Sequence, residues 1–248
     1  MCGRFASTSS PAALAQTFDV DEISIETGLP ERYNVAPTSD VYAVTERAPG
    51  CRALRTLRWG LVPSWAKDPS IGARMINARS DTVATKPAYR SALARRRAII
   101  PIDAFYEWQA RPGTAAGKAP KQPWAIRRVD GQPMAAAGLW EVWRSPTDPD
   151  EILHTCAIVT TEPNEVTSPI HDRMPVLLDR WSWDRWLDPK SDPDGLLELL
   201  VPFPATELEA WPVSTAVNHA ANEGAHLLDP AEVPTPKASH ATPGKLLT

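Results

Sequence analysis

The second residue of the chain is a cysteine, and this position gives it chemistry that an internal cysteine lacks. A small residue at position 2 permits removal of Met1, which leaves a free α-amine beside the Cys2 thiol. The amine can condense with an aldehyde, and the thiol can then close a five-membered thiazolidine ring, helped by the high effective concentration of an intramolecular reaction. With ordinary pKa values of about 7.7–8.0 for the amine and about 8.5 for the thiol, both groups have reactive forms near neutral pH. Cys2 is therefore a candidate nucleophile toward a carbonyl.

Four short segments elsewhere are dense in polar and aromatic side chains. Each has a structural alternative, because tryptophans can fill a core, a glutamate can pair with an arginine, and a histidine can be satisfied within a loop. As a set they suit single-stranded nucleic acid, whose bases stack on aromatic rings while arginines hold the phosphates. The segments are residues 58–65 with Trp59 and Trp65, 77–80 with Asn77 and Arg79, 105–108 with Glu107 and Trp108, and 171–175 with His171 and Arg173.

The charge of the chain is distributed unevenly. The formal net charge is −4, which alone disfavours a nucleic-acid partner. Residues 51–100, however, carry eleven lysines and arginines against two acids, whereas residues 101–248 carry twelve against twenty-one. A local basic segment can bind phosphates in a protein that is acidic overall. On charge alone, a solvated arginine-rich surface explains the segment equally well.

The cysteines and the apolar pattern indicate the compartment. Cys2, Cys51 and Cys156 are odd in number and form no Cys-x-x-Cys pair, which excludes a disulfide framework and argues against structural zinc. No cofactor or metal motif is present, so neither is expected. There is no apolar run of about 18 residues and no apolar signal segment at the N-terminus. We therefore expect a reduced, cytoplasmic protein without a membrane partner, and a monomer by default.

Helix and strand signals indicate the elements that must position these residues. Ser10 followed by Pro11 marks a helix start, because serine caps the first turn and proline fits the first helical position. The pattern predicts helices over residues 11–18, 87–97, 180–187 and 194–200, and surface loops over 111–123 and 147–150. It predicts strands over residues 41–45, 53–57, 98–102, 105–109, 124–128, 135–143, 153–161 and 176–178.

These elements predict an α+β fold. The strands are short and many, and they alternate only weakly with helices, which argues against a doubly wound sheet. We expect a single domain over residues 2–230, with a mostly antiparallel, distorted barrel-like sheet core flanked by short helices, and a loosely ordered tail over residues 231–248. Strand alternation places Phe105 and Glu107 on one face of their strand, with Tyr106 and Trp108 on the other.

Seven ordered motifs make the sequence resemble the SOS-response-associated peptidase (SRAP) family. The similarity spans residues 2 to about 230, nearly the whole chain. Two departures are Ala104, where the family has glycine before Phe-Tyr-Glu-Trp, and Ala225, where proline often follows Asn-Glu-Gly; both concern local backbone geometry. The motifs are Met-Cys-Gly-Arg-Phe, Tyr33-Asn34-Val35-Ala36-Pro37, Trp-Gly-Leu-Val-Pro-Ser-Trp, Asn-Ala-Arg-Ser-Asp-Thr, Phe-Tyr-Glu-Trp, His-Asp-Arg-Met-Pro, and Val217-Asn218 with Asn222-Glu223-Gly224.

The resemblance implies a sensor of abasic sites in single-stranded DNA. The family's N-terminal cysteine, which forms a thiazolidine DNA–protein crosslink that shields the lesion, matches Cys2. The resemblance further implies a cytoplasmic, nucleoid-associated location, with replication proteins as further candidate partners. Implied catalytic residues are Cys2, Glu107, His171 and Asn77, and implied DNA-binding residues are Arg4, Arg79, Arg173, Trp59, Trp108 and Asn34.

Two other functions remain open at this point. In the first, Cys2 is the nucleophile of a cysteine peptidase with Glu107 or His171 as base, its activity extending no further than exposing its own N-terminus. With only Met1 before Cys2, there is little to remove, which disfavours this reading. In the second, the chain is a noncovalent single-strand-binding module that uses its basic segment and tryptophans. That reading leaves the position of Cys2 unexplained.

Overall fold

The computed structural model describes residues 2–48, 50–110 and 121–233. Its strands are β1 (Phe5–Ser7), β2 (Glu22–Ile23), β3 (Arg32–Val35), β4 (Asp40–Ala48), β5 (Cys51–Trp59), β6 (Asn77–Arg79), β7 (Arg97–Ile102), β8 (Ala104–Gln109), β9 (Gln122–Arg128), β10 (Met134–Arg144), β11 (Ile152–Thr161), β12 (Met174–Pro175) and β13 (Leu208–Pro212). Its α-helices are α1 (Pro11–Thr17), α2 (Arg90–Arg95), α3 (Trp183–Leu187) and α4 (Pro193–Leu196), and its 3-10 helices are η1 (Pro69–Arg74), η2 (Arg180–Ser182), η3 (Leu197–Leu199), η4 (Ala205–Glu207), η5 (Thr215–Asn218) and η6 (Ala225–Leu228).

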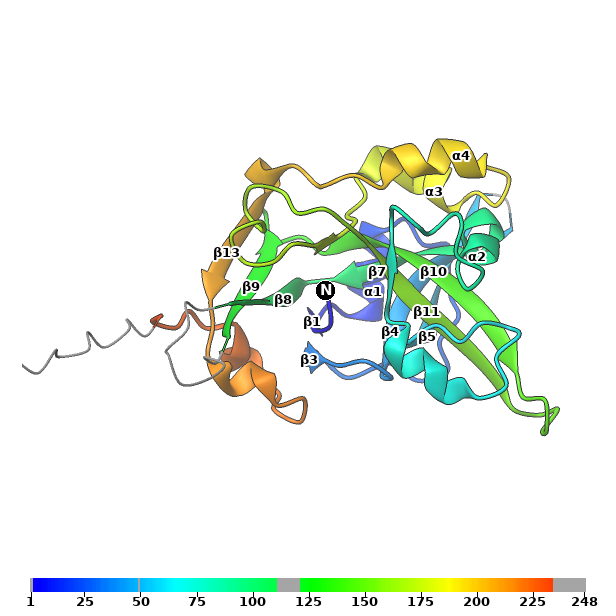
Figure 1. Ribbon diagram of the computed structural model, residues 1–248, viewed down its shortest axis with the longest axis horizontal. Coiled ribbons are helices and arrows are strands. Elements are labelled where there is room, and N and C mark those ends of the chain that lie inside the picture. The colour runs from blue at the N-terminus through cyan, green and yellow to red at the C-terminus, as the bar shows by residue number, and fades with distance from the viewer. Residues whose placement is uncertain (1, 49, 111–120, 234–248) are drawn as a thin grey trace, which may run out of the picture.

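Five strands close into a barrel in the order β5-β4-β7-β10-β11 (Figure 1). Neighbours within this order are antiparallel. The ring closes where β11 pairs in parallel with the end of β5, through Thr155 with Arg58 and Cys156 with Trp59. The expected α+β class with a distorted, mostly antiparallel barrel is confirmed.

A second, antiparallel sheet lies beside the barrel in the order β13-β9-β8-β1-β3 (Figure 1). The chain crosses from one sheet to the other at Asp103, the single residue between β7 and β8. That crossing residue also anchors the N-terminal segment, because its carboxylate accepts hydrogen bonds from the backbone and hydroxyl groups of both Thr8 and Ser9. The first residues of the chain are thereby fixed at the junction of the two sheets.

The barrel strands alternate between two cores. On β7, Ile99 belongs to a cluster that also contains helix residues such as Leu14 and Trp186. Ala98 and Ile100, which point the other way, pack in a cluster with Phe5 of the N-terminal strand. Helices thus cover one face of the barrel strands, and the other face packs against the second sheet and the chain's first residues.

The helices agree with the sequence expectations in position and are shorter in extent. Ser10 caps α1 by accepting a hydrogen bond from the Ala13 amide, with Pro11 in the first turn. The helix predicted over 87–97 is wrong at both ends, because α2 spans only Arg90–Arg95. Arg97 already belongs to β7, where its buried guanidinium donates to the Leu93, Trp186 and Asp188 carbonyls. The predicted helices 180–187 and 194–200 each combine a short α-helix with a 3-10 turn.

The long predicted strands are confirmed. Short strands were predicted less well, because few residues cannot show an alternating pattern. The strand predicted over 176–178 is wrong: β12 is Met174–Pro175, and only an isolated bridge from Leu177 to Ala136 follows. Strands β1, β2, β3, β6 and β13 were not anticipated, since they have two to five residues each. The 147–150 loop is confirmed. Residues 111–120 of the other predicted loop and 234–248 of the predicted tail lie outside the described residues. The loop prediction is wrong at its end, because Gln122 and Pro123 already belong to β9. At the start of the tail, the Ala231 amide donates to the Pro212 carbonyl.

The backbone conformation at the two departures from the family motifs is ordinary. Positive φ at non-glycine residues is confined, in the described ranges, to Asp19 and Thr38, so Ala104 and Ala225 need no glycine-like backbone. Ala104 opens β8 as the partner of Ala6. Among the helices of the same ranges, none is long and apolar enough to cross a membrane.

Candidate active site

The N-terminal strand places Cys2 beside β8. Phe5 pairs with Phe105, and the Tyr106 amide donates to the Arg4 carbonyl at 2.9 Å. The Cys2 side chain is wholly buried in the cluster that contains Phe5 and Phe105. Burial, reinforced by the nearby charge of Glu107, raises the pKa of the Cys2 thiol. The thiol and the Glu107 carboxyl therefore share one site at the middle of the molecule, where the N-terminus lies in Figure 1.

Glu107 is a buried carboxyl on β8, with only 2% of its surface exposed. Burial raises its pKa from 4.5 to about 7, because a charged carboxylate is poorly solvated there. The expected strand alternation is confirmed, since Tyr106 and Trp108 pack in a separate cluster on the opposite face from Phe105. A carboxyl whose pKa lies near neutrality can both donate and accept a proton at physiological pH.

His171 faces the same carboxyl. Its Nε2 atom lies 3.9 Å from Oε2 of Glu107, and its Nδ1 atom accepts a hydrogen bond from the Arg173 amide. Burial lowers the pKa of His171, and the Asp172 carboxylate, 2.9 Å from Nδ1, opposes this shift. Two groups compete at Nδ1, because the Arg173 amide donates to this nitrogen whereas the Asp172 carboxylate would accept its proton. The two groups form an adjacent pair of titrating side chains.

The loop that carries His171 is tied to the strand that carries Glu107. Gln109, two residues beyond Glu107 on β8, donates from its side-chain amide to the Pro169 carbonyl at 2.9 Å. The His171 amide donates to the Thr167 carbonyl, and the buried Asn164 side chain accepts from the Thr167 amide and hydroxyl. The imidazole position thus follows from loop hydrogen bonds as well as from its own contacts.

Asn77 holds the backbone of Cys2. Its side-chain amide donates to the Cys2 carbonyl at 2.7 Å, and its backbone carbonyl accepts a hydrogen bond from the Tyr89 hydroxyl. Asn77 opens β6, which lies parallel to β11 with Asn77 opposite Ile158. The Oδ1 atom of Asn77 is buried and has no hydrogen-bond partner among the described residues. It is therefore an available acceptor next to Cys2.

Two arginines lie near one residue of β11, Thr160. Arg79 pairs with Thr160 through β6, and the Arg173 guanidinium donates to the Thr160 carbonyl. Burial and the nearby charge of Arg79 both lower the pKa of Arg173, as expected for neighbouring cations. Arg79 is exposed, and its guanidinium forms an ion pair with Asp81. The site therefore has a basic edge beside its buried centre.

Arg4 and Asn34 form a separate hydrogen-bonded unit. The Asn34 amide donates to the carbonyls of Val217, His219 and Asn222, while its Oδ1 atom accepts from Arg4. Asn34 is wholly buried, and a contact between its side chain and DNA stays a prediction. Burial lowers the pKa of Arg4, whose guanidinium also donates to the Val217 carbonyl. Asn34 therefore holds Arg4 and the chain at residues 217–222 in place.

The tryptophans of the motifs occupy different environments. Trp59 is wholly buried against Phe5, with ring centroids 5.0 Å apart, and its indole donates to the Ile76 carbonyl. The ring of Trp59 is thus packed inside the protein, and its contact with a flanking base stays a prediction. Trp65 is 60% exposed, and Trp108 is half-buried with its indole donating to the Asn218 side chain. Trp65 belongs to the same motif as Trp59, and the motif alone does not show that one ring is exposed and the other buried.

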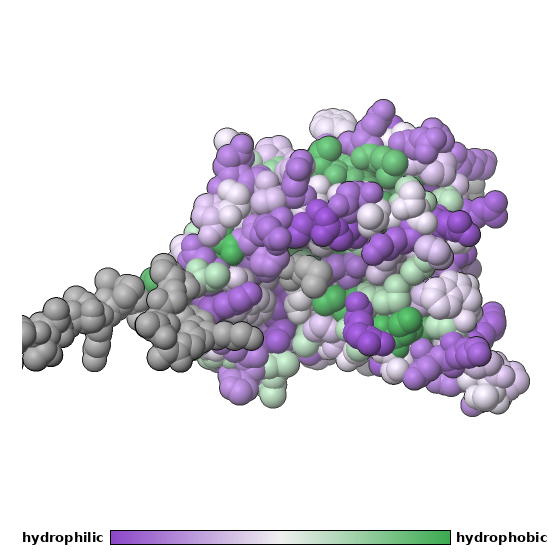
Figure 2. Space-filling view, in the orientation of Figure 1, coloured by the Kyte–Doolittle hydropathy of each residue, from purple (hydrophilic) through white to green (hydrophobic). Residues whose placement is uncertain are grey.

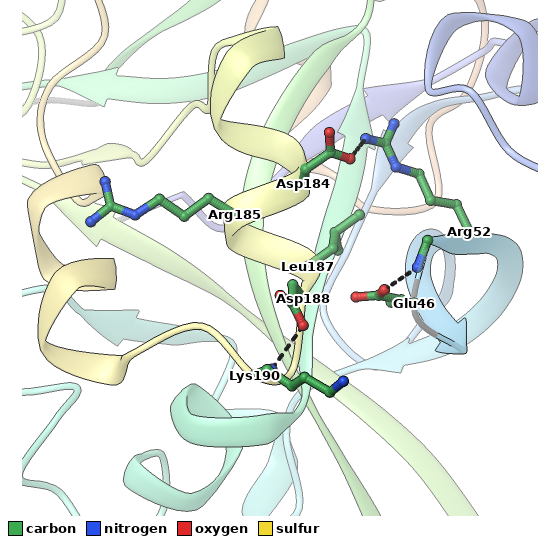
Figure 3. A pocket seen from close by; sticks show the side chains of 8 residues that line it. Glu46, Arg52, Asp184, Arg185, Leu187, Asp188 and Lys190 are labelled. Carbon is green, nitrogen blue, oxygen red and sulfur yellow. Dashed lines mark hydrogen bonds and ion pairs between the residues drawn. The ribbon is translucent and has the colours of Figure 1, made fainter.

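A cavity of about 320 Å³ elsewhere contains none of these residues. In Figure 3, Arg52 pairs with Asp184, while Glu46 accepts from the Gly50 amide and Asp188 from the Lys190 amide. Around the middle of the face seen in Figure 2, hydrophilic and hydrophobic side chains lie next to one another. Within the described part of the chain, no cluster of His, Cys, Asp or Glu could hold a metal ion.

A distorted barrel with a polar site built around the chain's first residues defines the class of protein. The chain belongs to the SRAP family, whose model is described as SOS response associated peptidase and matches residues 1–220. The family resemblance inferred from the motifs is confirmed.

Several proteins of known name are similar to this chain in sequence. The chain is 43% identical over 230 residues to the abasic site processing protein YoaM of Bacillus subtilis, covering 92% of this chain and 98% of that protein. It is 31% identical over 236 residues to the abasic site processing protein YedK of Escherichia coli, covering 93% and 100%. A solved protein from Bacteroides thetaiotaomicron has the same fold, with a TM-score of 0.80 at 23% identity and coverage of 93% and 100%.

Proposed function

We propose that this protein processes abasic sites in single-stranded DNA by forming a thiazolidine crosslink through Cys2 after removal of Met1. The surroundings of Cys2 carry the proposal: Asn77 holds its backbone, and Glu107, whose pKa burial raises to about 7, is near enough for its charge to act on the Cys2 thiol. An aldehyde needs both a proton donor and a proton acceptor to pass through imine and thiazolidine formation. The relatives named as abasic site processing proteins support the choice of aldehyde.

The bond-forming steps use groups already described. The Cys2 amine attacks C1′ of the ring-opened sugar, and the resulting carbinolamine loses water with a proton from Glu107 or His171. The thiol sulfur then attacks the iminium carbon, and its proton passes to the Glu107 carboxylate. Burial keeps the thiol protonated until that step, so a base within the site is required. The balance is one water lost and one C–N and one C–S bond formed.

Capture by sulfur has a protective consequence. An iminium at an abasic site can lose the 3′ phosphate by β-elimination, which breaks the strand. Ring closure consumes the iminium before that happens, aided by the intramolecular position of the thiol. The crosslinked product therefore keeps the DNA strand intact.

The basic edge and the accessible rings would hold the DNA. Arg79 and Arg173 provide guanidinium groups for backbone phosphates, and Arg4, two residues after Cys2 in the chain, is a third candidate. Trp65 and Trp108 offer ring surface for flanking bases. Replacing Arg79 with alanine should weaken binding and reduce the slope of log K against log salt by about 0.7, the loss of one phosphate contact in single-stranded DNA.

The decisive test is intact mass spectrometry with an oligonucleotide that carries one abasic site. Protein lacking Met1 should give an adduct at the combined mass less one water, and peptide mapping should place it on Cys2. Cys2→Ala should abolish the adduct, while Cys51→Ala, the matched control, should retain it. Adduct formation by Cys2→Ala would refute the mechanism. Unchanged binding with no adduct, before and after acetylation of the N-terminus, would indicate a noncovalent single-strand-binding module instead.

A peptidase built on Cys2 is the second candidate, and the family description names that activity. An activated cysteine nucleophile needs a lowered thiol pKa. Here burial and the Glu107 charge raise the pKa of Cys2, and burial also disfavours an imidazolium at His171. The electrostatics therefore favour attack by the amine first. Turnover of an unstructured protein substrate by wild type but not by Cys2→Ala would favour the peptidase.

A further inference from the structure

The phosphate-binding edge of Arg79 is already occupied by a carboxylate of the same chain. Nε of Arg79 donates to Oδ1 of Asp81 at 3.1 Å, and Nη2 donates to Oδ2 at 2.6 Å. These two parallel hydrogen bonds occupy the Nε–Nη2 face of the guanidinium, one of the two faces with which an arginine can bind two phosphate oxygens. A phosphate can take this bidentate position only after Asp81 leaves it.

Asp81 lies beside two cations, Arg79 and Arg173, which favour its charged form. The hydrogen bond from Arg79 holds the pKa of Asp81 below its ordinary value, and the charge of Arg173 contributes. Both partners of the pair are about half exposed, at 55% for Arg79 and 49% for Asp81. An ion pair with this exposure is weak and can exchange with a phosphate, because water screens it and solvates both separated charges.

We propose that Asp81 is a specificity-determining residue, which competes with backbone phosphates for Arg79 and so weakens the hold of the protein on intact single-stranded DNA. This inference rests on the proposed function. On undamaged DNA every encounter must displace Asp81 using noncovalent contacts alone. At an abasic site the crosslink retains the DNA whether or not Asp81 has been displaced. The competition therefore shortens unproductive encounters more than productive ones.

The chain contains a matched control for this pair. Arg128 and Asp130 are also two residues apart, with Nε to Oδ1 at 2.9 Å and Nη2 to Oδ2 at 2.7 Å. They lie at the end of β9, where Glu207 also contacts Arg128. Asp130→Asn thus makes the same change of charge in the same local geometry, away from Asn77, Glu107 and His171. It reports the effect of one lost negative charge in general.

The test measures the Kd for a fluorescein-labelled oligothymidylate at low salt, in a Cys2→Ala background that cannot crosslink. Asp81→Asn should tighten binding by about two- to fivefold, the range expected for releasing an exposed ion pair. Asp130→Asn should have a smaller effect. In an Arg79→Ala background the gain from Asp81→Asn should shrink to that of Asp130→Asn, because the competed group is gone.

Two results would overturn the inference. One is equal binding by the Asp81→Asn and Asp130→Asn proteins, and the other is a full gain in the Arg79→Ala background. Crosslinking of an abasic oligonucleotide is scored separately, with Cys2 intact. If no crosslink forms, the proposed function is refuted, while the effect of Asp81 on oligothymidylate binding can still be measured. Failure of the Asp81 test beside normal crosslinking would refute only the role of Asp81.

Discussion

The imidazole of His171 and the carboxyl of Glu107 approach each other across two elements, with Nε2 and Oε2 3.9 Å apart. Burial acts on both, raising the pKa of Glu107 to about 7 and lowering that of His171. Both shifts favour the uncharged forms, a protonated Glu107 carboxyl beside a neutral imidazole. In the proposed mechanism Glu107 can then supply a proton when water leaves the carbinolamine and take one back when the thiol adds, with the imidazole as its neighbour.

This pairing predicts that the two residues act as a unit in crosslinking. Glu107→Gln and His171→Gln should each slow the single-turnover crosslinking rate by about 100-fold or more, the usual contribution of general acid–base catalysis. The double variant should be much less impaired than the product of the single losses, because each loss disables the same proton exchange. Quench-flow rates of the four proteins check this. Independent, multiplicative losses would show that the residues serve separate steps.

Glu107 should also make the stability of the protein depend on pH. Its pKa is 4.5 ordinarily and about 7 in the folded protein, so between these values the folded state holds a proton that the unfolded state lacks. Unfolding then releases a proton, and the free energy of unfolding falls as pH rises through this window, by about 2–4 kcal/mol in total. Urea unfolding of wild type and Glu107→Gln at pH 4.5 and pH 8 tests this. The decrease should be absent from the variant, and an equal decrease in both would assign it to another group.

Substitutions of Trp59 and Trp65, which belong to one motif, should affect different properties, the first the stability of the fold and the second DNA binding. Trp59→Ala removes a wholly buried ring and should destabilise the fold by about 3–5 kcal/mol. Trp65→Ala removes a ring that is 60% exposed and should change stability by less than about 0.5 kcal/mol while weakening single-stranded DNA binding by about 1–3 kcal/mol. Urea unfolding and fluorescence anisotropy measure the two effects. Unchanged binding by Trp65→Ala would remove this residue from the proposed DNA contacts.

Asp103 should control how well the N-terminal segment is held. Its carboxylate accepts hydrogen bonds from both Thr8 and Ser9, so Asp103→Ala leaves these donors without that partner. We expect faster amide exchange in Phe5–Ser7 and slower crosslinking, while the barrel strands keep their protection. Hydrogen exchange and single-turnover rates measure this, with Asp103→Asn as the conservative control. Slower crosslinking with unchanged exchange in β1 would argue against an anchoring role.

Much of the fold could be predicted from local sequence pattern, because a long strand contains enough residues to show a recognisable apolar or alternating pattern. The runs within β4, β5, β7, β10 and β11 contain enough alternating or apolar residues to be recognised, and these strands form the closed barrel. Strands such as β6 and β12 could not be recognised, since two or three residues carry no period. They exist because β11 supplies hydrogen bonds to both.

Helix ends were decided by tertiary contacts. Arg97 belongs to a run of three arginines that suits the end of a helix. In the fold its guanidinium is buried and donates to three carbonyls, two of them around α3, and its backbone joins β7. Those partners lie about ninety residues away in the sequence. Local propensity contains no information about them.

The sequence by itself determined the family, the α+β class and the chemical groups on offer, because these depend on residue types and their order. Only the tertiary structure decided what each group can reach. Asn34 and Trp59 sit in motifs that look functional and are wholly buried, whereas Trp65 is exposed. Burial depends on packing partners brought from distant parts of the chain, as when Asn34 meets carbonyls 183 to 188 residues further along. The proximity of Glu107 to Cys2 and to His171 arises in the same way.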